Sequence, residues 1–243
     1  MFLKAQLSVI PTKEDKLPAL LSWKPYQSKR IAEDEVEALF SGANVKGLAI
    51  ICGAISGGLE VIDVDTKHDT TGSLWDELRG LIEDNLPELY SRLVIAQTKS
   101  GGYHIYYRCS SIAGNLKLST KLNREVLIET RGEGGYVVAP PTPGYTYIQG
   151  EPGNIPTITP EDREILFSIA KSFNELEEIK PKVTTSTTYN STGLSPFEDY
   201  NQRGDIVALL ESKGWKVVTQ RGQRINLIVT GKLPYRAKSI KSI

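Results

Sequence analysis

Short runs in which hydrophobic and polar residues alternate cover much of the chain, and they predict a structure rich in strands. The clearest run is GGLEVIDVD at 57–65, where two glycines precede the alternation. Because neighbouring side chains of a strand point to opposite faces, Val61, Asp63 and Asp65 should share one face. Similar runs bounded by glycine or proline predict further strands at 47–53, 92–98, 103–109, 126–132, 134–141 and 144–149, whereas LSVIP at 7–11 is a short apolar run followed by turn residues.

Apolar residues at helical spacing predict four helices between and after these strands. In residues 70–87, Leu74, Leu78 and Ile82 recur every fourth position, and Pro87 marks the end of the helix. The other helices are expected at 32–40, 160–176 and 203–215, and a hairpin is expected at 216–229.

Composition divides the chain into three predicted segments. Residues 1–178 hold most of the periodic runs and should form the main domain. Residues 179–196 are rich in Ser and Thr and poor in apolar residues, which favours a linker. Residues 197–243 form a small basic segment, because the last 31 residues carry eight Lys and Arg and no acid while the whole chain is neutral. Such a tail is typical either of a nucleic-acid contact or of a solvated end.

The N-terminus and the cysteines bear on where the protein works. MFLKAQLSVIPTKEDK has a short apolar run and no small-residue cleavage site, so it does not resemble a signal peptide. No run approaches the length of a membrane span, and we therefore expect a cytoplasmic protein with no membrane partner. Cys52 and Cys109 lie in apolar runs without a CxxC or Cys/His cluster, so we interpret both as core thiols.

Asp63 and Asp65 are notable because they end an apolar strand, where an unpaired charge is costly to bury. Two positions apart on one strand, their backbones should lie about 6 to 7 Å apart with both carboxylates pointing the same way. Such oxygen ligands suit hard divalent cations. An Asx turn or a helix cap could use either residue instead, so the pair alone leaves both interpretations open.

A second candidate motif is SGGYH at 100–104. Its two glycines allow the backbone to approach a ligand closely, and backbone N–H groups, the Ser100 hydroxyl and His104 could hold phosphate oxygens. The chain has only two histidines, which disfavours a histidine-based metal site. A lone histidine on a strand can equally be a hydrogen-bonded core residue.

A third candidate motif is VLIETRG at 126–132, where Leu127, Glu129 and Arg131 share one face of the expected strand. A carboxylate and a guanidinium therefore emerge side by side. One interpretation is a third metal ligand next to a clamp for a phosphate or a base. The other is a simple surface ion pair, which would contribute little.

Four stretches, in this order, resemble the successive motifs of the bifunctional DNA primase/polymerase (Prim-Pol) domain of the archaeo-eukaryotic primase superfamily: DKLPALLSWKPYQ, SGGLEVIDVD, SGGYHIYY and IETRGEGGYVVAPP. The resemblance covers roughly residues 5–175. It implies an α+β fold with mixed and antiparallel sheets and flanking helices, plus a small C-terminal appendage. It also implies three catalytic metal ligands, Asp63, Asp65 and Glu129, the last at a position where many relatives have aspartate.

The implied activity is template-directed nucleotidyl transfer, as a DNA primase, a DNA polymerase or both, with two Mg²⁺ or Mn²⁺ ions. The incoming NTP or dNTP would be gripped by Ser100, His104, Arg131 and Lys99. A single-stranded DNA template would meet scattered cations such as Lys117, Lys121 and Arg124. A solvated charged loop explains those three cations equally well. The implied setting is replication of a phage, plasmid or other mobile element.

Relatives usually continue into a helicase, but this chain has no GxxxxGK[ST] phosphate loop. We therefore expect a helicase as a separate protein or as a domain lost by truncation. Two other functions are compatible with part of the pattern. A metal-dependent glycosyltransferase can also place DxD after an apolar strand, but it leaves Glu129 and the SGGYH motif unexplained. A non-catalytic module that binds single strands or origins could keep the same fold.

Overall fold

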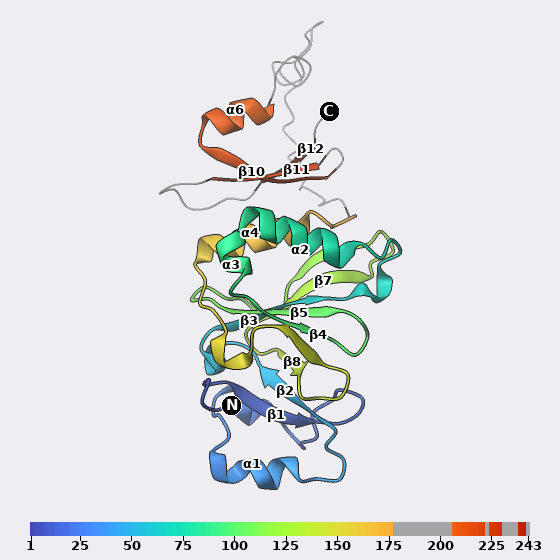
Figure 1. Ribbon diagram of the computed structural model, residues 1–243, viewed down its shortest axis with the longest axis vertical. Coiled ribbons are helices and arrows are strands. Elements are labelled where there is room, and N and C mark those ends of the chain that lie inside the picture. Colours follow the sequence, from blue (N-terminus) through green and yellow to red (C-terminus); the bar gives the residue numbers. More distant parts are fainter. Residues whose placement is uncertain (177–205, 222–223, 230–237, 242–243) are drawn as a thin grey trace, which may run out of the picture.

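The computed structural model of the chain describes residues 1–176, 206–221, 224–229 and 238–241 (Figure 1). These residues form three sheets with flanking helices, which confirms the predicted α+β class. The strands are β1 (Ser8–Thr12), β2 (Gly47–Ile51), β3 (Leu59–Val64), β4 (Val94–Gln97), β5 (Tyr103–Arg108), β6 (Lys117–Thr120), β7 (Val126–Arg131), β8 (Tyr136–Ala139), β9 (Thr146–Gln149), β10 (Trp215–Arg221), β11 (Arg224–Val229) and β12 (Lys238–Lys241). The α-helices are α1 (Glu33–Phe40), α2 (Leu74–Asn85), α3 (Pro87–Tyr90), α4 (Pro160–Lys171) and α6 (Ile206–Ser212).

A six-stranded sheet forms the centre of the molecule, with the strand order β6-β7-β3-β5-β4-β9. All the ladders between its strands are antiparallel. β3 lies in the interior of this sheet, between β7 and β5, and almost all of its residues are buried. Its alternating side chains therefore enter two different environments, one on each face of the sheet.

Helices α2 and α4 cover one face of the six-stranded sheet (Figure 1). The apolar positions that predict α2, Leu74, Leu78 and Ile82, are all buried against Ile62 and other core residues. α4 begins at Pro160, and the Thr159 side chain accepts a hydrogen bond from the Asp162 backbone N–H, as expected of a capped helix start. This packing gives the sheet a closed, apolar helical side.

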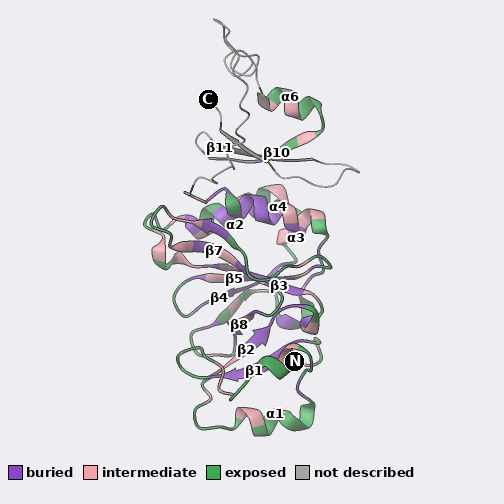
Figure 2. Ribbon diagram, turned by 180° about the vertical axis from the view of Figure 1, so that it is seen from behind, coloured by how far each residue is buried: buried purple, intermediate pink, exposed green. Residues whose placement is uncertain are grey.

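A smaller sheet of order β1-β2-β8 packs on the opposite side of the six-stranded sheet (Figure 2). Val61 of β3 and Tyr106 of β5 are fully buried in the core between the two sheets. The two sheets are joined in sequence where β7 passes through the turn at residues 132–135 into β8. This arrangement brings residues of both sheets to the border of one cavity, described below.

A third sheet, of order β10-β11-β12, lies beyond α4 on the helical side (Figure 1). Val218 of β10 is buried against the same core as α2 and α4. The predicted helix at 203–215 corresponds to α6, which ends at Ser212 because Gly214 has a positive φ of 81° and Trp215 already begins β10; residues 203–205 lie outside the described residues. The predicted hairpin corresponds to β10 and β11.

Several predicted boundaries differ from those observed. β6 has no counterpart among the predicted strands, since KLST is short and its place at the edge of the sheet depends on its pairing with β7. The helix expected at 160–176 ends at Lys171, and the one expected at 70–87 begins at Leu74, whose backbone N–H donates to Asp69. The predicted linker at 179–196 lies outside the described residues, so the domain boundaries stay a prediction.

The predicted core thiols are both buried, and burial raises the pKa of the Cys52 thiol. Among the described residues, no helix combines the length and the apolar character needed to cross a membrane.

Candidate active site

Pairing of the central strands places three of the candidate side chains side by side. Asp63 of β3 lies directly opposite His104 of β5 on one side and opposite Glu129 of β7 on the other. Directly paired residues of antiparallel strands point to the same face, so all three side chains share the face that looks away from α2 and α4. Arg131 joins them on this face, two positions after Glu129.

These side chains border a cavity of about 490 Å³ between the two sheets. Its lining includes the predicted residues Asp63, Asp65, Ser100, His104, Glu129 and Arg131. The opposite wall comes from the turn at residues 15–17, from Trp23 and from β8. A volume of this size is typical of a site for a small ligand such as a nucleotide.

Asp63 is held between two nitrogen-bearing side chains. Its Oδ1 lies 3.5 Å from Nε2 of His104, and its Oδ2 lies 3.6 Å from Nε of Arg131. Burial raises the pKa of the Asp63 carboxyl, but the contacts with His104 and Arg131 together bring it below its usual value. The surroundings of Asp63 therefore favour the ionised form of its carboxyl.

Glu129 forms an ion pair with the guanidinium of Arg131. Burial raises the pKa of the Glu129 carboxyl by more than Arg131 lowers it, and the neighbouring charge of Asp63 raises it further. On the other side of β7, Lys117 of the edge strand β6 lies directly opposite Glu129. One arginine thus contacts both carboxylates, which would otherwise repel each other across the two strands.

Asp65 follows the last residue of β3 and stays on the cavity side. Its Oδ1 also accepts a hydrogen bond of 2.9 Å from the Lys67 backbone N–H, which starts a short 3-10 helix at Thr66–His68. The cap and the metal interpretation of this residue are therefore compatible, because a carboxylate has a second oxygen and further lone pairs.

His104 is almost entirely buried, with 6% of its surface exposed. Its Nδ1 lies 3.2 Å from the Tyr106 hydroxyl, two positions along the same face of β5. The ring therefore has a fixed orientation, with Nε2 directed towards Asp63 and the cavity. His104 is therefore both a hydrogen-bonded, buried residue and a residue that lines the cavity.

The SGG turn lies against the end of β3. Gly101 has a φ of +85°, and a Cβ on Gly102 would stand only 2.4 Å from the Val64 carbonyl oxygen, so neither position tolerates a larger residue. Ser100 lines the cavity next to Thr98, whose hydroxyl lies 3.3 Å from that of Ser100. The glycines thus bring the turn as close as possible to the strand that carries Asp63.

Lys99 has a different position from the other predicted nucleotide-binding residues. Its side chain is 54% exposed, does not line the cavity, and forms an ion pair of 2.8 Å with Glu14. The predicted template contacts lie on β6 and the turn that follows it: Lys117 starts β6, the Lys121 ammonium donates to the His68 carbonyl, and Arg124 occupies the turn with a φ of +69°.

Aromatic residues of the cavity are absent from the predicted site. Trp23 and Tyr136 meet edge to face, with 5.1 Å between their ring centroids, and Tyr145 lies 6.1 Å from the His104 ring. Trp23 and Tyr136 stand within motifs quoted above, but a sequence alone does not tell a cavity-lining aromatic residue from a core one.

The donor set fits hard divalent cations, since three carboxylates border one cavity and oxygen is the ligand that Mg²⁺ and Mn²⁺ prefer. Within the described part of the chain, no three His, Cys, Asp or Glu side chains are close enough to form a ready-made metal site. Arg131 contacts the two strand carboxylates instead. A cation bound here would take over the charge compensation that Arg131 provides.

The comparisons with known proteins agree with this architecture. A family model described as "Bifunctional DNA primase/polymerase, N-terminal" matches residues 2–161, about two thirds of the chain. No curated protein matches the chain. The matched region contains both sheets that border the cavity and all the candidate site residues. This chain belongs to the bifunctional DNA primase/polymerase (Prim-Pol) family.

Proposed function

We propose that this chain catalyses template-directed nucleotidyl transfer, extending or starting a nucleic-acid strand from nucleoside triphosphates. The family supports nucleotidyl transfer in replication as the general activity. The observation that carries the proposal is the strand register, which places Asp63, Glu129 and His104 together on the face that borders the cavity.

Asp63, Asp65 and Glu129 are the residues that would hold Mg²⁺ or Mn²⁺, two ions in our proposal. When bound, such ions lower the pKa of the attacking hydroxyl and neutralise charge on the phosphates. This role explains why carboxylates are present on the buried central strand, where they would be costly without a counter-charge.

The other cavity residues would bind and orient the triphosphate. Ser100 offers a hydroxyl, and the glycine turn beside it offers backbone N–H groups at close range. His104 can donate a hydrogen bond from its Nε2–H to a phosphate oxygen while Tyr106 fixes its ring. Arg131, once a cation compensates the carboxylates, is free to pair with a phosphate through its planar fork of donors. Lys99 would first have to leave Glu14.

The template would follow the β6 edge of the six-stranded sheet. Lys117 is exposed on this edge strand directly opposite Glu129, so a DNA backbone at Lys117 would lie next to the reaction centre. Lys121 and Arg124 continue in the same direction towards the turn before β7. Sequence-independent binding of this kind depends on phosphate contacts and weakens with salt.

A primer-extension assay tests the proposal. The protein is incubated with a single-stranded DNA template, labelled NTPs or dNTPs, and Mg²⁺ or Mn²⁺, with and without a primer. We expect template-dependent products that disappear with EDTA and in Asp63→Asn. Binding of the template without metal-dependent synthesis would favour a non-catalytic module, and hydrolysis of a sugar nucleotide would favour a glycosyltransferase.

The biological setting that we propose is replication of a phage, plasmid or other mobile element in the cytoplasm, together with a helicase. The support is the family's link to replication and the lack of a phosphate-loop motif in this sequence.

A further inference from the structure

Lys16 is a cavity-lining cation to which the sequence analysis assigns no role, although it lies in the region that the family model matches. It lies in the turn after β1, and its neighbours Asp15 and Leu17 line the same cavity. Its φ is +70°, a left-handed conformation that is uncommon for residues other than glycine. A lysine in such a turn costs conformational energy, so the position calls for a physical reason.

The turn that carries Lys16 is firmly held. The Lys13 backbone N–H donates to the Leu17 carbonyl over 2.8 Å, and the Lys16 N–H donates to the Lys13 carbonyl over 3.1 Å. The Asp15 side chain accepts a hydrogen bond from the Leu17 N–H, which commits one of its oxygens. Lys16 therefore lines the cavity from a turn whose backbone is held by hydrogen bonds, and the residue is exposed.

An ion pair connects this turn to the SGG turn of the candidate site. Glu14 and Lys99 lie 2.8 Å apart, two residues before Lys16 and directly before Ser100 respectively. Two loops from different sheets are thus side by side at one end of the cavity. Lys16 lies at the same end as Ser100, where the proposed function places the triphosphate.

The charges that line the cavity leave a deficit of positive charge. Four carboxylates and two permanent cations, Lys16 and Arg131, are among the lining residues. Arg131 is paired with Asp63 and Glu129, whereas the Lys16 ammonium makes no hydrogen bond or ion pair with any residue that the structure describes. A nucleoside triphosphate adds about four negative charges, which two divalent cations only balance. An unpaired ammonium at the phosphate end would then be strongly attracted to the ligand.

We infer that Lys16 binds the β- or γ-phosphate of the incoming nucleotide, from the turn after β1, on the other side of the cavity from Asp63 and Glu129. This inference rests on the proposed function for its ligand, and it adds a phosphate contact from the small sheet. The turn fixes the backbone of Lys16, while the flexible side chain allows the ammonium to adjust to the position of the phosphates.

The test measures nucleotide binding with no chemistry. Affinities for ATP, dATP, AMP and inorganic tripolyphosphate are measured by calorimetry with Ca²⁺ in place of Mg²⁺, for wild type and for Lys16→Asn. Asparagine tolerates the left-handed conformation, so this variant removes the charge and keeps the turn. We expect ATP, dATP and tripolyphosphate to bind about tenfold more weakly or worse, with AMP changed less than about twofold.

Two further variants make the test specific. Lys13→Asn removes an exposed cation from the same turn that does not line the cavity, so the triphosphate affinity should stay at the wild-type value. Lys16→Arg keeps the positive charge and should restore most of the affinity for tripolyphosphate. Circular dichroism establishes that each variant is folded before its binding is measured.

The failure of this inference is distinguishable from the failure of the proposed function. Unchanged affinity of Lys16→Asn for ATP and tripolyphosphate would overturn the role of Lys16, and so would an equal loss for AMP and ATP. If Asp63→Asn abolished primer extension in the same series, the proposed function would still stand. Full extension by Asp63→Asn would instead refute the proposed function.

Discussion

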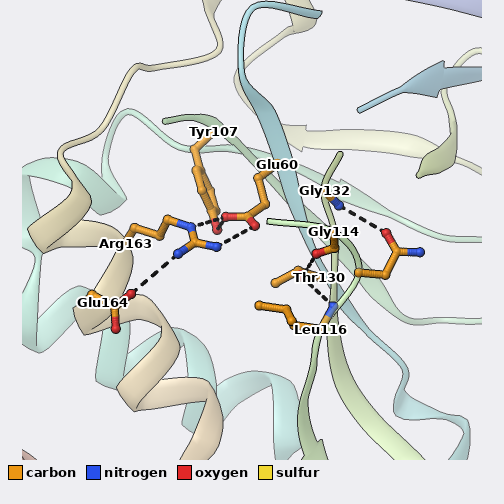
Figure 3. Close-up of polar contacts among 9 residues, drawn as sticks. Glu60, Tyr107, Gly114, Leu116, Thr130, Gly132, Arg163 and Glu164 are labelled. Atoms are coloured by element: carbon orange, nitrogen blue, oxygen red, sulfur yellow. Dashed lines mark hydrogen bonds and ion pairs between the residues drawn. The ribbon is translucent and has the colours of Figure 1, made fainter. Parts of the chain in front are cut away.

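Two acidic side chains of β3, Glu60 and Asp63, lie on opposite faces of the same central strand and have opposite surroundings. Glu60 faces the helices and is completely buried. Its two oxygens accept hydrogen bonds of 2.5 and 2.9 Å from the Arg163 guanidinium, and the Tyr107 hydroxyl donates to it over 2.7 Å (Figure 3). Arg163 also lies 4.0 Å above the Phe167 ring. This group is closed on all sides.

The Asp63 side of the strand is open. Asp63 and Glu129 both contact the Arg131 guanidinium, and the distance from Arg131 to Asp63 is the longer of the two. Both carboxylates border the cavity. A fully buried ion pair can stabilise the fold, but a cation from solvent cannot reach it. Two carboxylates that border a cavity are accessible to such a cation. We therefore expect Glu60 to contribute to stability and propose that Asp63 binds a ligand, although both are acids on one strand.

The largest expected effect is on activity at the open site. Asp63→Asn keeps the size of the side chain but removes a cation ligand, so primer extension should fall by roughly a thousandfold. The free energy of unfolding should change by less than about 1 kcal/mol, since the relief of repulsion with Glu129 offsets the weakened contacts with His104 and Arg131. Extension assays and urea unfolding measure the two effects.

Asp76→Asn on the outer surface of α2 is the matched control for that variant, because Asp76 is 73% exposed and distant in the fold from the cavity lining. It should retain both activity and stability. Near-normal primer extension by Asp63→Asn would contradict the proposal that the cavity face of β3 serves activity while the helical face serves stability.

The largest expected effect on stability is at the closed site. Arg163→Met would leave Glu60 buried without its cation, and the free energy of unfolding should fall by about 3 to 5 kcal/mol. The double variant Glu60→Gln/Arg163→Met should recover a substantial part of this loss, because it removes the uncompensated charge and leaves an acceptor for Tyr107. A small loss for Arg163→Met, below about 1 kcal/mol, would show that the pair is not the closed unit described here.

Arg131→Met tests whether a cation can replace the arginine at the open site. Without metal, the variant should be less stable than wild type by about 1 to 2 kcal/mol, because Asp63 and Glu129 lose their shared counter-charge. Added Mg²⁺ should raise the melting temperature of the variant more than that of wild type. Arg79→Met, an exposed arginine on α2, serves as the control. An equal rise in melting temperature with Mg²⁺ in wild type, Arg131→Met and Arg79→Met would contradict the idea that a cation can replace Arg131.

The smallest expected effect separates the two faces most finely. Tyr107→Phe removes one hydrogen bond to Glu60, which keeps both bonds to Arg163, and should lower the free energy of unfolding by about 0.5 to 1 kcal/mol. Primer extension by the folded protein should remain normal, since Tyr107 points to the helical face, away from the cavity. A selective loss of activity would indicate that the two faces are coupled.

Local sequence patterns predict the strands of the site well. The alternation at 57–65 predicts β3 to within two residues of each end and places Asp63 and Asp65 on one side. The runs at 103–109 and 126–132 predict β5 and β7 equally closely. These strands are long enough for their own alternation to define them, which KLST of β6 is not.

Register and partners could not be predicted in the same way. Nothing local in the sequence states that Asp63 pairs with His104 and Glu129, because antiparallel register depends on how distant strands pack. The same limit hides the contact of Glu60 with Arg163, 103 residues further along the chain. The turn of Lys16 belongs to a motif of the family, but only the fold places it opposite the carboxylates.

The central claim is that the cavity face of β3 binds divalent cations. Crystals soaked in Mn²⁺, with diffraction data collected near the Mn absorption edge, test it most directly. We expect anomalous peaks among the carboxylates of Asp63, Asp65 and Glu129, with the Arg131 guanidinium moved away from Glu129. Peaks elsewhere only, with the pair of Arg131 and Glu129 intact at saturating Mn²⁺, would contradict the claim.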